Sequence, residues 1–498
     1  MKERIINYLR AGYSGIYIVS SEETRVEAEI KGVCDTVQYG LHVWSVTEGL
    51  VSLSDQQVQN AQDPLEAIEA CDELPENSLV LLKDFHSFIE DGNPVLIRKL
   101  KEALRAGKAR GRVLVILGCR LALPPELERE FVVLDFVLPD REALGIILDN
   151  IARAGEQPDA EGTERELLLD AATGLTSIEA ENAYALSLVE SGRLNHEVVA
   201  REKAHEVGKN GLLEIISNVR SLNDVGGLDL LKEWLIARQD AFGKEAREYG
   251  LPAPKGLLIV GIPGTGKSLT AKATASVLQR PLLRLDTGRL FGGLVGQSEG
   301  NLRSVIATVE AIAPCVLWID EIEKGFGGNS GGQMDGGTST RVFGTFLSWM
   351  QERAAPVFIV ATANDVTKLP AEFLRKGRFD ELFFVDLPSE VERGSVWRIQ
   401  IEKYGRKPAD YDIIQLARAA DGWTGAEIEQ LFIESLYTAF AKRREPTDLD
   451  IMMGSEDLVP LSKLMADDIK ALRRWSQGRA RSASSTEEKN STRRIKTK

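Results

Sequence analysis

The chain has 498 residues, of which 43% are hydrophobic and 27% are charged, and its formal net charge is −14. This length predicts two to four domains, and the acidic balance argues against a general nucleic-acid binder, whose surface needs positive potential. No apolar run approaches the roughly 18 residues of a membrane-spanning helix, and four scattered cysteines with only four histidines argue against a disulfide framework or a metal site.

The first apolar runs of the chain, at residues 15–19, 78–83 and 112–117, are typical of buried parallel strands. The first run is followed by Ser-Ser-Glu-Glu at residues 20–23, a segment without glycine. Its two carboxylates would repel a phosphate group. The first half is therefore predicted to be an α/β domain that serves as a scaffold, an adaptor or a partner-binding domain rather than a nucleotide site.

A second set of strands begins at residues 256–260, and the segment after it has the pattern G-x-x-x-x-G-K-[ST]. Its glycines let backbone N–H groups and the next helix N-terminus face the phosphates of a nucleotide. Lys267 is expected to reach the β and γ phosphates, and the Ser268 hydroxyl is expected to bind Mg²⁺. The nucleotide-binding residues predicted in this segment are Gly261, Ile262, Pro263, Gly264, Thr265, Gly266, Lys267, Ser268 and Leu269.

Polar side chains follow the next two strands. After the apolar run at 315–319, Asp320 is expected to hold Mg²⁺ and Glu321 to polarise an attacking water. A solvated helix start is the alternative for such a pair, but the preceding strand favours the catalytic interpretation. The strand at 356–363 ends at Asn364, which is placed to bind the γ-phosphate or the water, with a turn residue as the alternative.

A basic turn comes next and contains Arg375 and Arg378. Their guanidinium groups are candidates for stabilising the charge of a transition state, either in the same chain or across an interface. A solvated basic turn is the alternative.

The two halves of the chain share an order of landmarks. The strand at 15–19 matches the strand at 256–260, and Asp84 matches Asp320. Several such matches at near-constant spacing indicate an internal duplication, although any two α/β domains share landmarks of this kind.

On this alignment Phe85 stands where the second half has Glu321. The position equivalent to Asn364 falls near Cys119 or Arg120. The first half is then a degenerate copy, which keeps the fold and loses the ATP chemistry.

From Leu222 to about Ile433, the order of these motifs resembles the AAA family of ring-forming ATPases, in its classical branch. The resemblance implies ATP and Mg²⁺ as ligands and a homo-oligomer, a hexameric ring in the presence of ATP, that acts on a protein client. It also implies the following roles: an adenine pocket with Asp224 and Gly226, a sensor at Asn364, arginine fingers at Arg375 and Arg378 that complete a neighbour's site, and a nucleotide-facing lid turn with Gly425 and Ala426.

One departure from the family concerns its central-pore loop. Leu294 stands where the members that thread polypeptides carry an aromatic residue, which puts threading in doubt. The alternative is that Leu294 only packs against a neighbour. The glycine-rich segment 325–337 predicts a mobile loop, either a second pore loop or a plain connection.

The predicted fold class is α/β, with two tandem AAA-like P-loop modules, each a parallel sheet with flanking helices and a small helical lid, the first module degenerate. The predicted boundaries are 1–140 for the degenerate domain, 141–205 for its lid-like segment, 206–221 for a linker, 222–388 for the ATPase core, 389–477 for the lid and C-terminal helix, and 478–498 for a disordered basic tail. RNA or anionic membrane is a weaker alternative role for the tail.

Residues 340–352 and 374–384, together with the degenerate first half, resemble one subfamily: the AAA-type ATPase of conserved open reading frames in cyanobacteria and algal plastid genomes. This resemblance implies a cytoplasmic or stromal location and a link to photosynthesis or inorganic-carbon regulation. Two functions stay open: an Mg²⁺-dependent ATP hydrolase that remodels or regulates a protein partner, and a nucleotide-gated scaffold with weak ATPase activity. A nucleic-acid-associated factor is a third, supported only by the tail.

Overall fold

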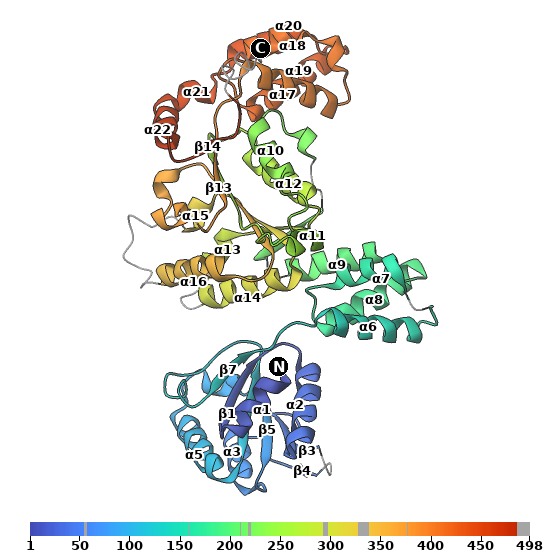
Figure 1. Ribbon diagram of the computed structural model, residues 1–498, viewed down its shortest axis with the longest axis vertical. Helices are drawn as coiled ribbons and strands as arrows, with labels where there is room; N and C mark the ends of the chain where they lie inside the picture. The colour runs from blue at the N-terminus through green and yellow to red at the C-terminus, as the bar shows by residue number, and fades with distance from the viewer. Residues whose placement is uncertain are drawn as a thin grey trace. The chain divides into compact units, whose positions relative to one another are not determined.

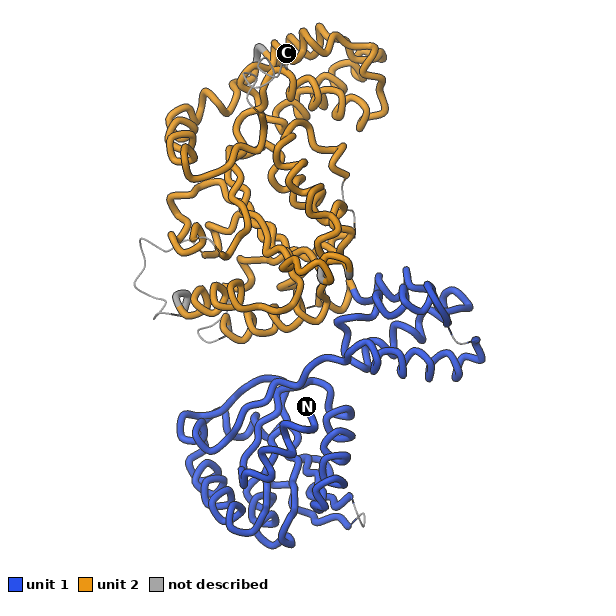
Figure 2. The backbone as a smooth tube through the Cα atoms, in the orientation of Figure 1, with its two compact units in different colours: residues 1–203 blue, residues 204–498 orange. Residues whose placement is uncertain are grey.

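The computed structural model describes residues 1–53, 57–158, 160–209, 211–217, 221–291, 297–326, 338–375 and 377–485. The chain divides into two compact units, residues 1–203 and 204–498 (Figure 2). Leu294, most of the glycine-rich segment 325–337 and the last part of the basic tail lie outside the described residues. Among the described helices, none has the length and apolar character to cross a membrane.

Unit 1 begins with a seven-stranded sheet in the order β4-β3-β2-β5-β6-β1-β7 (Figure 1). The strands from β2 to β7 in this order pair in parallel, whereas β3 and β4 are antiparallel additions at one edge. The strands are β1 (Gly15–Val19), β2 (Gly40–Ser45), β3 (Gly49–Ser52), β4 (Val58–Gln59), β5 (Ser78–Lys83), β6 (Val113–Gly118) and β7 (Val132–Asp135).

Helices cover both faces of this sheet. Because successive side chains of a strand point to opposite faces, Ile16 and Ile18 join the apolar cluster under α1 and α2, and Tyr17 joins the cluster under α3 and α5. Burial on both faces explains why the strands are continuous apolar runs in the sequence. The helices are α1 (Lys2–Arg10), α2 (Glu23–Val37), α3 (Pro64–Glu73), α4 (His86–Ile89) and α5 (Pro94–Arg110).

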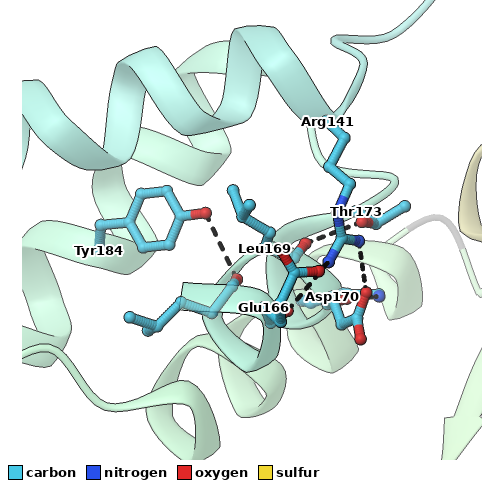
Figure 3. A network of polar contacts seen from close by, with 8 residues as sticks. Arg141, Glu166, Leu169, Asp170, Thr173 and Tyr184 are labelled. Atoms are coloured by element: carbon cyan, nitrogen blue, oxygen red, sulfur yellow. Dashed lines mark hydrogen bonds and ion pairs between the residues drawn. The ribbon is translucent and has the colours of Figure 1, made fainter. Parts of the chain in front are cut away.

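Three helices and the first part of a fourth, α9, complete unit 1 around a separate apolar core. The Arg141 guanidinium reaches the carboxylates of Glu166 and Asp170 on the next helix, and the buried Tyr184 hydroxyl donates to the Leu168 carbonyl at 3.4 Å (Figure 3). These contacts fix the small helical module that the sequence predicts after the first sheet. Its helices are α6 (Arg141–Ala154), α7 (Gly162–Ala172), α8 (Ser177–Ser191) and α9 (His196–Gly208).

Unit 2 contains a second seven-stranded sheet, in the order β14-β13-β9-β12-β11-β10-β8. All its pairings are parallel except that of β8 with β10. The strands are β8 (Leu213–Ile216), β9 (Gly256–Gly261), β10 (Leu282–Leu285), β11 (Cys315–Ile319), β12 (Val357–Ala363), β13 (Glu381–Val385) and β14 (Arg481–Ser482).

Two apolar clusters lie on the two faces of the second sheet. One contains buried residues of α10 and α12, and the other contains residues of α13 to α16. The helices around this core are α10 (Asp229–Ile236), α11 (Lys244–Glu248), α12 (Lys267–Leu278), α13 (Thr287–Phe291), α14 (Gln297–Ile312), α15 (Ile322–Phe326) and α16 (Thr338–Glu352), with short 3₁₀ turns η1 (Leu222–Asp224), η2 (Val366–Lys368) and η3 (Ala371–Leu374).

The C-terminal helices form a lid with its own core around Trp397 and Phe432, both fully buried. A capping box of Thr424 and Glu427 starts α19, as one of Thr176 and Glu179 starts α8 in unit 1. The lid elements are α17 (Glu390–Lys403), η4 (Pro408–Asp410), α18 (Ile413–Ala419), α19 (Gly425–Ala441) and α20 (Asp448–Asp457), followed by α21 (Leu461–Leu464) and α22 (Ala466–Ser476).

The two units share a strand order. Strands β10-β11-β12-β9-β13 of the second sheet follow one another as β2-β5-β6-β1-β7 do in the first. In each unit this sheet carries helices on both faces and precedes a helical lid. The predicted fold class, α/β with two tandem modules, is confirmed.

The strand registers correct one detail of the predicted alignment of the halves. Aligning Gly15 with Gly256 makes their partners Leu114 and Ile359 equivalent. The same comparison can be carried from β6 to β5 and from β12 to β11 through their pairings. It makes Asp84 equivalent to Glu321 rather than to Asp320.

The backbone supports this alignment independently. Asp84 and Glu321 both have left-handed φ values, of 52° and 49°. In both units the carbonyl of this residue accepts a bond from the amide three residues later, at 3.1 Å from Ser87 and 2.8 Å from Lys324. The sequence suggests the other alignment because an aspartate, Asp84 or Asp320, directly follows each strand.

Two predicted boundaries also need correction. The linker predicted at 206–221 contains β8, which pairs with β10 and so belongs to the second sheet. The tail predicted to be disordered from residue 478 contains β14, which pairs with β13 at the opposite edge. Ala483 just after it is fully buried, so backbone pairing and one small apolar side chain hold a segment whose composition suggested disorder.

Candidate functional site

A cavity of about 850 Å³ opens in unit 2 between the carboxyl ends of its central strands and the lid. It is lined by four groups of residues: the segment before α10, the glycine-rich loop with the start of α12, polar residues at the ends of β11 and β12, and residues of the lid. The predicted site residues on its wall are Asp224, Gly226, Pro263, Gly264, Thr265, Gly266, Lys267, Ser268, Leu269, Asp320, Glu321, Asn364, Gly425 and Ala426.

The glycine-rich loop joins β9 to α12 and touches the lid. Gly264 has φ of +79°, and a Cβ there would lie 2.9 Å from the Thr424 hydroxyl oxygen. The Gly264 carbonyl accepts a bond from the Ala426 amide at 3.1 Å. A residue without a side chain therefore lets the loop approach the first turn of α19. Gly261 and Ile262 do not line the cavity, but their carbonyls bind Lys267.

Lys267 is the first residue of α12 and is 6% exposed. Its Nζ donates to the carbonyls of Gly261 at 2.9 Å and Ile262 at 2.7 Å. Burial lowers the pKa of this amine to about 8, while the carboxylates of Glu323, Asp320 and Glu321 act in the opposite direction. The loop thus holds an amine whose charge depends on the anions around it.

Oxygen atoms gather beside this lysine. The Ser268 hydroxyl donates to Asp320 Oδ1 at 3.1 Å, and the Thr362 hydroxyl donates to the same oxygen at 2.6 Å. A hydroxyl with a carboxylate is a donor set that suits Mg²⁺, which prefers oxygen ligands and keeps several waters. Ser268 and Asp320 therefore fit the predicted metal, and Thr362 fixes the orientation of the carboxylate.

Glu321 and Asn364 meet across the ends of β11 and β12. Asn364 Nδ2 donates to Glu321 Oε1 at 2.8 Å, and Lys324 Nζ lies 2.5 Å from Glu321 Oε2. The Glu321 amide donates to the Thr362 hydroxyl at 3.0 Å. The left-handed backbone of Glu321 thus places a carboxylate, fixed at both oxygens, on the wall of the cavity.

Glu323 is a site neighbour that the sequence analysis missed. It is 6% exposed, its Oε1 accepts a bond from the Asn364 amide at 2.9 Å, and its Oε2 has no hydrogen-bond partner within the described part of the chain. Burial raises the pKa of this carboxyl group. The available signal was a third acid in the run Asp-Glu-Ile-Glu, which reads as an ordinary helix start.

The opposite wall comes from the segment before α10 and from the lid. A Cβ on Gly226 would lie 2.6 Å from a methyl carbon of Val396, so glycine allows this segment to pack on α17. Six further residues of this wall, on α17 and within α19, lie outside any motif of the sequence and were not predicted. They are Val396, Ile399, Gln400, Glu402, Lys403 and Glu429.

The structure does not bring Arg375 and Arg378 to this cavity. Arg375 is exposed, and Arg378 is half-buried with its guanidinium donating to the Glu372 carbonyl. Within a single chain, neither arginine is part of the same site as Lys267.

Unit 1 replaces the phosphate loop with a carboxylate contact. Ser20 occupies the position of Gly261, and only residues 21–22 then precede α2, whereas residues 262–266 precede α12. Glu22 is 3% exposed, and its Oε1 accepts a bond from the Ser177 amide at the start of α8 at 2.5 Å. A side-chain carboxylate that precedes α2 therefore binds the N-terminus of a different helix, α8.

Comparisons with known proteins agree with this architecture. The family model for "ATPase family associated with various cellular activities (AAA)" matches residues 257–387. Models for the N-terminal domain and the second domain of SpoVK-like AAA ATPases match residues 1–136 and 142–210.

Several full-length relatives have the same printed description, "Uncharacterized AAA domain-containing protein ycf46". One from Pyropia yezoensis is 40% identical and aligns over 96% of this chain and 98% of its own length. Others from Guillardia theta and Trieres chinensis are each 39% identical, over 96% and 97% of this chain and 95% and 98% of their own lengths. The resemblance recognised in the sequence is confirmed: this chain belongs to the AAA ATPases, in the group of ycf46 AAA domain-containing proteins.

Proposed function

We propose that unit 2 binds Mg²⁺–ATP in the cavity of its core and lid and hydrolyses it to ADP and phosphate. The observation that carries this proposal is the arrangement of Glu321, Asn364 and Lys267 on one cavity wall, beside the Ser268–Asp320 oxygen pair. A carboxylate, an amide, an amine and two oxygen ligands are the groups that phosphoryl transfer to water requires.

Each residue has a role in this proposal. Lys267 and the amides of residues 264–268 bind the phosphates, Ser268 and Asp320 hold the metal, and Glu321 accepts the proton of the attacking water while Asn364 orients that carboxylate. Mg²⁺, when bound, would neutralise charge on the phosphate oxygens.

The proposed site for the adenine of ATP is the part of the cavity wall that contains Asp224, Gly226, Gly425 and Ala426. The lid residues on α17 and α19 close over it. Binding would thus connect core and lid, which gives ATP a route to change the angle between them.

Arg375 and Arg378 do not line the cavity of their own chain, which favours a role for them in the nucleotide site of a neighbouring subunit. We therefore propose a homo-oligomeric ring that remodels or regulates a protein partner, in the cytoplasm or a plastid stroma. A nucleotide-gated scaffold with weak hydrolysis is the second candidate, supported by the loss of the phosphate loop in unit 1.

The test separates binding from turnover. Glu321→Gln should bind ATP with near-normal affinity and lose at least about a hundredfold in hydrolysis rate, because a positioned base contributes at least that much. Glu434→Gln, an exposed acid on α19, is the matched control and should keep both properties. Normal turnover by Glu321→Gln would contradict the assignment.

Assembly is measured on the same variant. Light scattering of Glu321→Gln with and without Mg²⁺–ATP should show growth to about six subunits if the arginines serve a neighbour. A persistent monomer with intact ATP binding would favour the scaffold.

A further inference from the structure

Unit 1 carries a different trio of side chains where unit 2 has its catalytic acids. By the strand registers, Asp84 is equivalent to Glu321 and Cys119 to Asn364. His86 lies two residues after Asp84, as Glu323 lies two residues after Glu321. The carboxyl ends of β5 and β6 therefore bring an aspartate, a histidine and a cysteine together, and the proposed ATPase does not use them.

The two nitrogens of the His86 ring are close to the other two side chains. The Nε2 atom of His86 is 3.9 Å from the Cys119 sulfur, and its Nδ1 atom is 3.9 Å from Asp84 Oδ1. The imidazole is 4% exposed, and within the described residues its Nδ1 has no hydrogen-bond partner. A thiol beside a base, with the base beside a carboxylate, is the order that activates a cysteine nucleophile.

Burial is the main influence on the protonation state of the His86 imidazole, and it favours the neutral ring. Burial lowers its pKa below the ordinary value, Asp84 raises it, Arg120 lowers it and Glu90 raises it. The net direction is downward, so the ring is neutral at neutral pH and its Nε2 can take the thiol proton. Arg120 and Glu90 form an exposed ion pair at 2.5 Å.

Hydrogen bonds of the Tyr17 side chain hold the segment that carries Cys119. The Tyr17 hydroxyl donates to the Arg120 carbonyl at 2.5 Å and accepts a bond from the Ala122 amide at 3.2 Å. Both bonds hold the backbone directly after the cysteine. The approach of the sulfur to His86 is therefore set by the fold rather than by a free loop.

Cys119 differs from the other three cysteines of the chain. Cys34, Cys71 and Cys315 are buried, and burial raises the pKa of the Cys34 and Cys71 thiols to about 12. Cys119 is exposed to solvent. A reagent in solution can reach this thiol and is excluded from the rest.

We propose that Cys119 is a thiol–disulfide exchange site for a small disulfide of the glutathione type, with His86 as its base. The Cys119 thiol transfers its proton to His86 Nε2, and the thiolate attacks one sulfur of the disulfide. A bond forms between Cys119 and that sulfur while the original S–S bond breaks. The leaving thiolate takes the proton back from His86, so Cys119 is oxidised to a mixed disulfide and one small thiol is released.

The experiment measures this exchange directly on the full chain. The protein is incubated with glutathione disulfide at pH 7, and the rate of single-adduct formation and the modified residue are determined by mass spectrometry. We expect one adduct, on Cys119, and none on Cys119→Ser. In His86→Asn the rate should fall about tenfold, less than a fully positioned base contributes, because 3.9 Å is a long contact.

His196→Asn, which removes an exposed imidazole at the start of α9, is the matched control and should react like the original chain. Equal rates in folded His86→Asn and in the original chain would overturn the proposal. If His86→Asn fails to fold, the reaction of native Cys119 is compared with that of the same chain in urea at the same pH. A native rate no faster than the unfolded one would also overturn it.

Discussion

The charge state of Lys267 predicts how nucleotide affinity changes with pH. The amine is buried with a pKa of about 8, so it is largely protonated at pH 7 and largely neutral at pH 9. Phosphate groups beside it would favour the charged form and raise this pKa. Nucleotide binding to the proposed site should therefore be accompanied by proton uptake between pH 7 and 9. The affinity for nucleotide should fall as the pH rises above 8.

The size of the effect follows from the pKa. At pH 8 about half a proton is taken up for each nucleotide bound, and at pH 9 about nine-tenths of a proton. The free energy needed to protonate the amine at pH 9 is about 1.4 kcal/mol, which is close to a tenfold loss of affinity relative to pH 7. Lys267→Arg should bind ADP more weakly overall and show no such loss, because a guanidinium stays charged throughout.

Isothermal titration calorimetry of ADP binding, in two buffers with different ionisation enthalpies, measures proton uptake directly. ADP with Mg²⁺ at pH 7, 8 and 9 avoids hydrolysis during the titration. An affinity that stays flat from pH 7 to 9 in the original chain would refute the inference that the buried amine is the titrating group. An equal pH dependence in Lys267→Arg would refute it as well.

Three further predictions concern stability and the lid. The pKa of Lys267 in the folded chain lies below its ordinary value of 10.5, so between about pH 8 and 10.5 the unfolded chain binds more protons than the folded chain does. The contribution of Lys267 to the free energy of unfolding of ligand-free unit 2 should therefore rise with pH through this window, which urea unfolding measures. Truncation after Gln477 should lower the Tm of unit 2 by about 4–8 °C, because it removes the pairing of β14 with β13, the two backbone bonds of Ala483 to Leu231 and Phe384, and the burial of Ala483. Gly264→Ala should weaken ADP binding by about 1–3 kcal/mol through its left-handed backbone and its contact with the lid, whereas Gly300→Ala in open space should not.

Much of unit 2 could be predicted because its site lies close to local signals. Parallel strands buried on both faces appear as short apolar runs, and their carboxyl ends meet at one edge of the sheet. Polar residues that directly follow such runs, as Asp320 and Asn364 do, must therefore converge, and the loop after β9 brings Lys267 to the same edge. The structure places them with Glu321 on one cavity wall, which is where the motif spacing predicts them.

The residues that the sequence did not reveal depend on tertiary structure. Gln400 and Lys403 line the cavity from α17, yet nothing in an amphipathic helix marks which exposed positions face a ligand. Thr362 reads as one more β-branched residue in a strand, and only the neighbouring strand gives its hydroxyl a carboxylate to bind. Strand β14 is held by backbone pairing, which low-complexity composition conceals.

The comparison of the two units shows how one fold can carry different side chains at the carboxyl ends of its strands. The apolar clusters of unit 1 lie on the two faces of its sheet, while Asp84, His86 and Cys119 follow the carboxyl ends of its strands. Residues at those ends contribute little to the core, so they can change independently of it. The left-handed backbone at Asp84 remains as it is at Glu321, although the side chains around it differ. A retained backbone geometry with a new, mutually oriented set of side chains is the reason to test unit 1 for chemistry of its own rather than treat it as an inert copy.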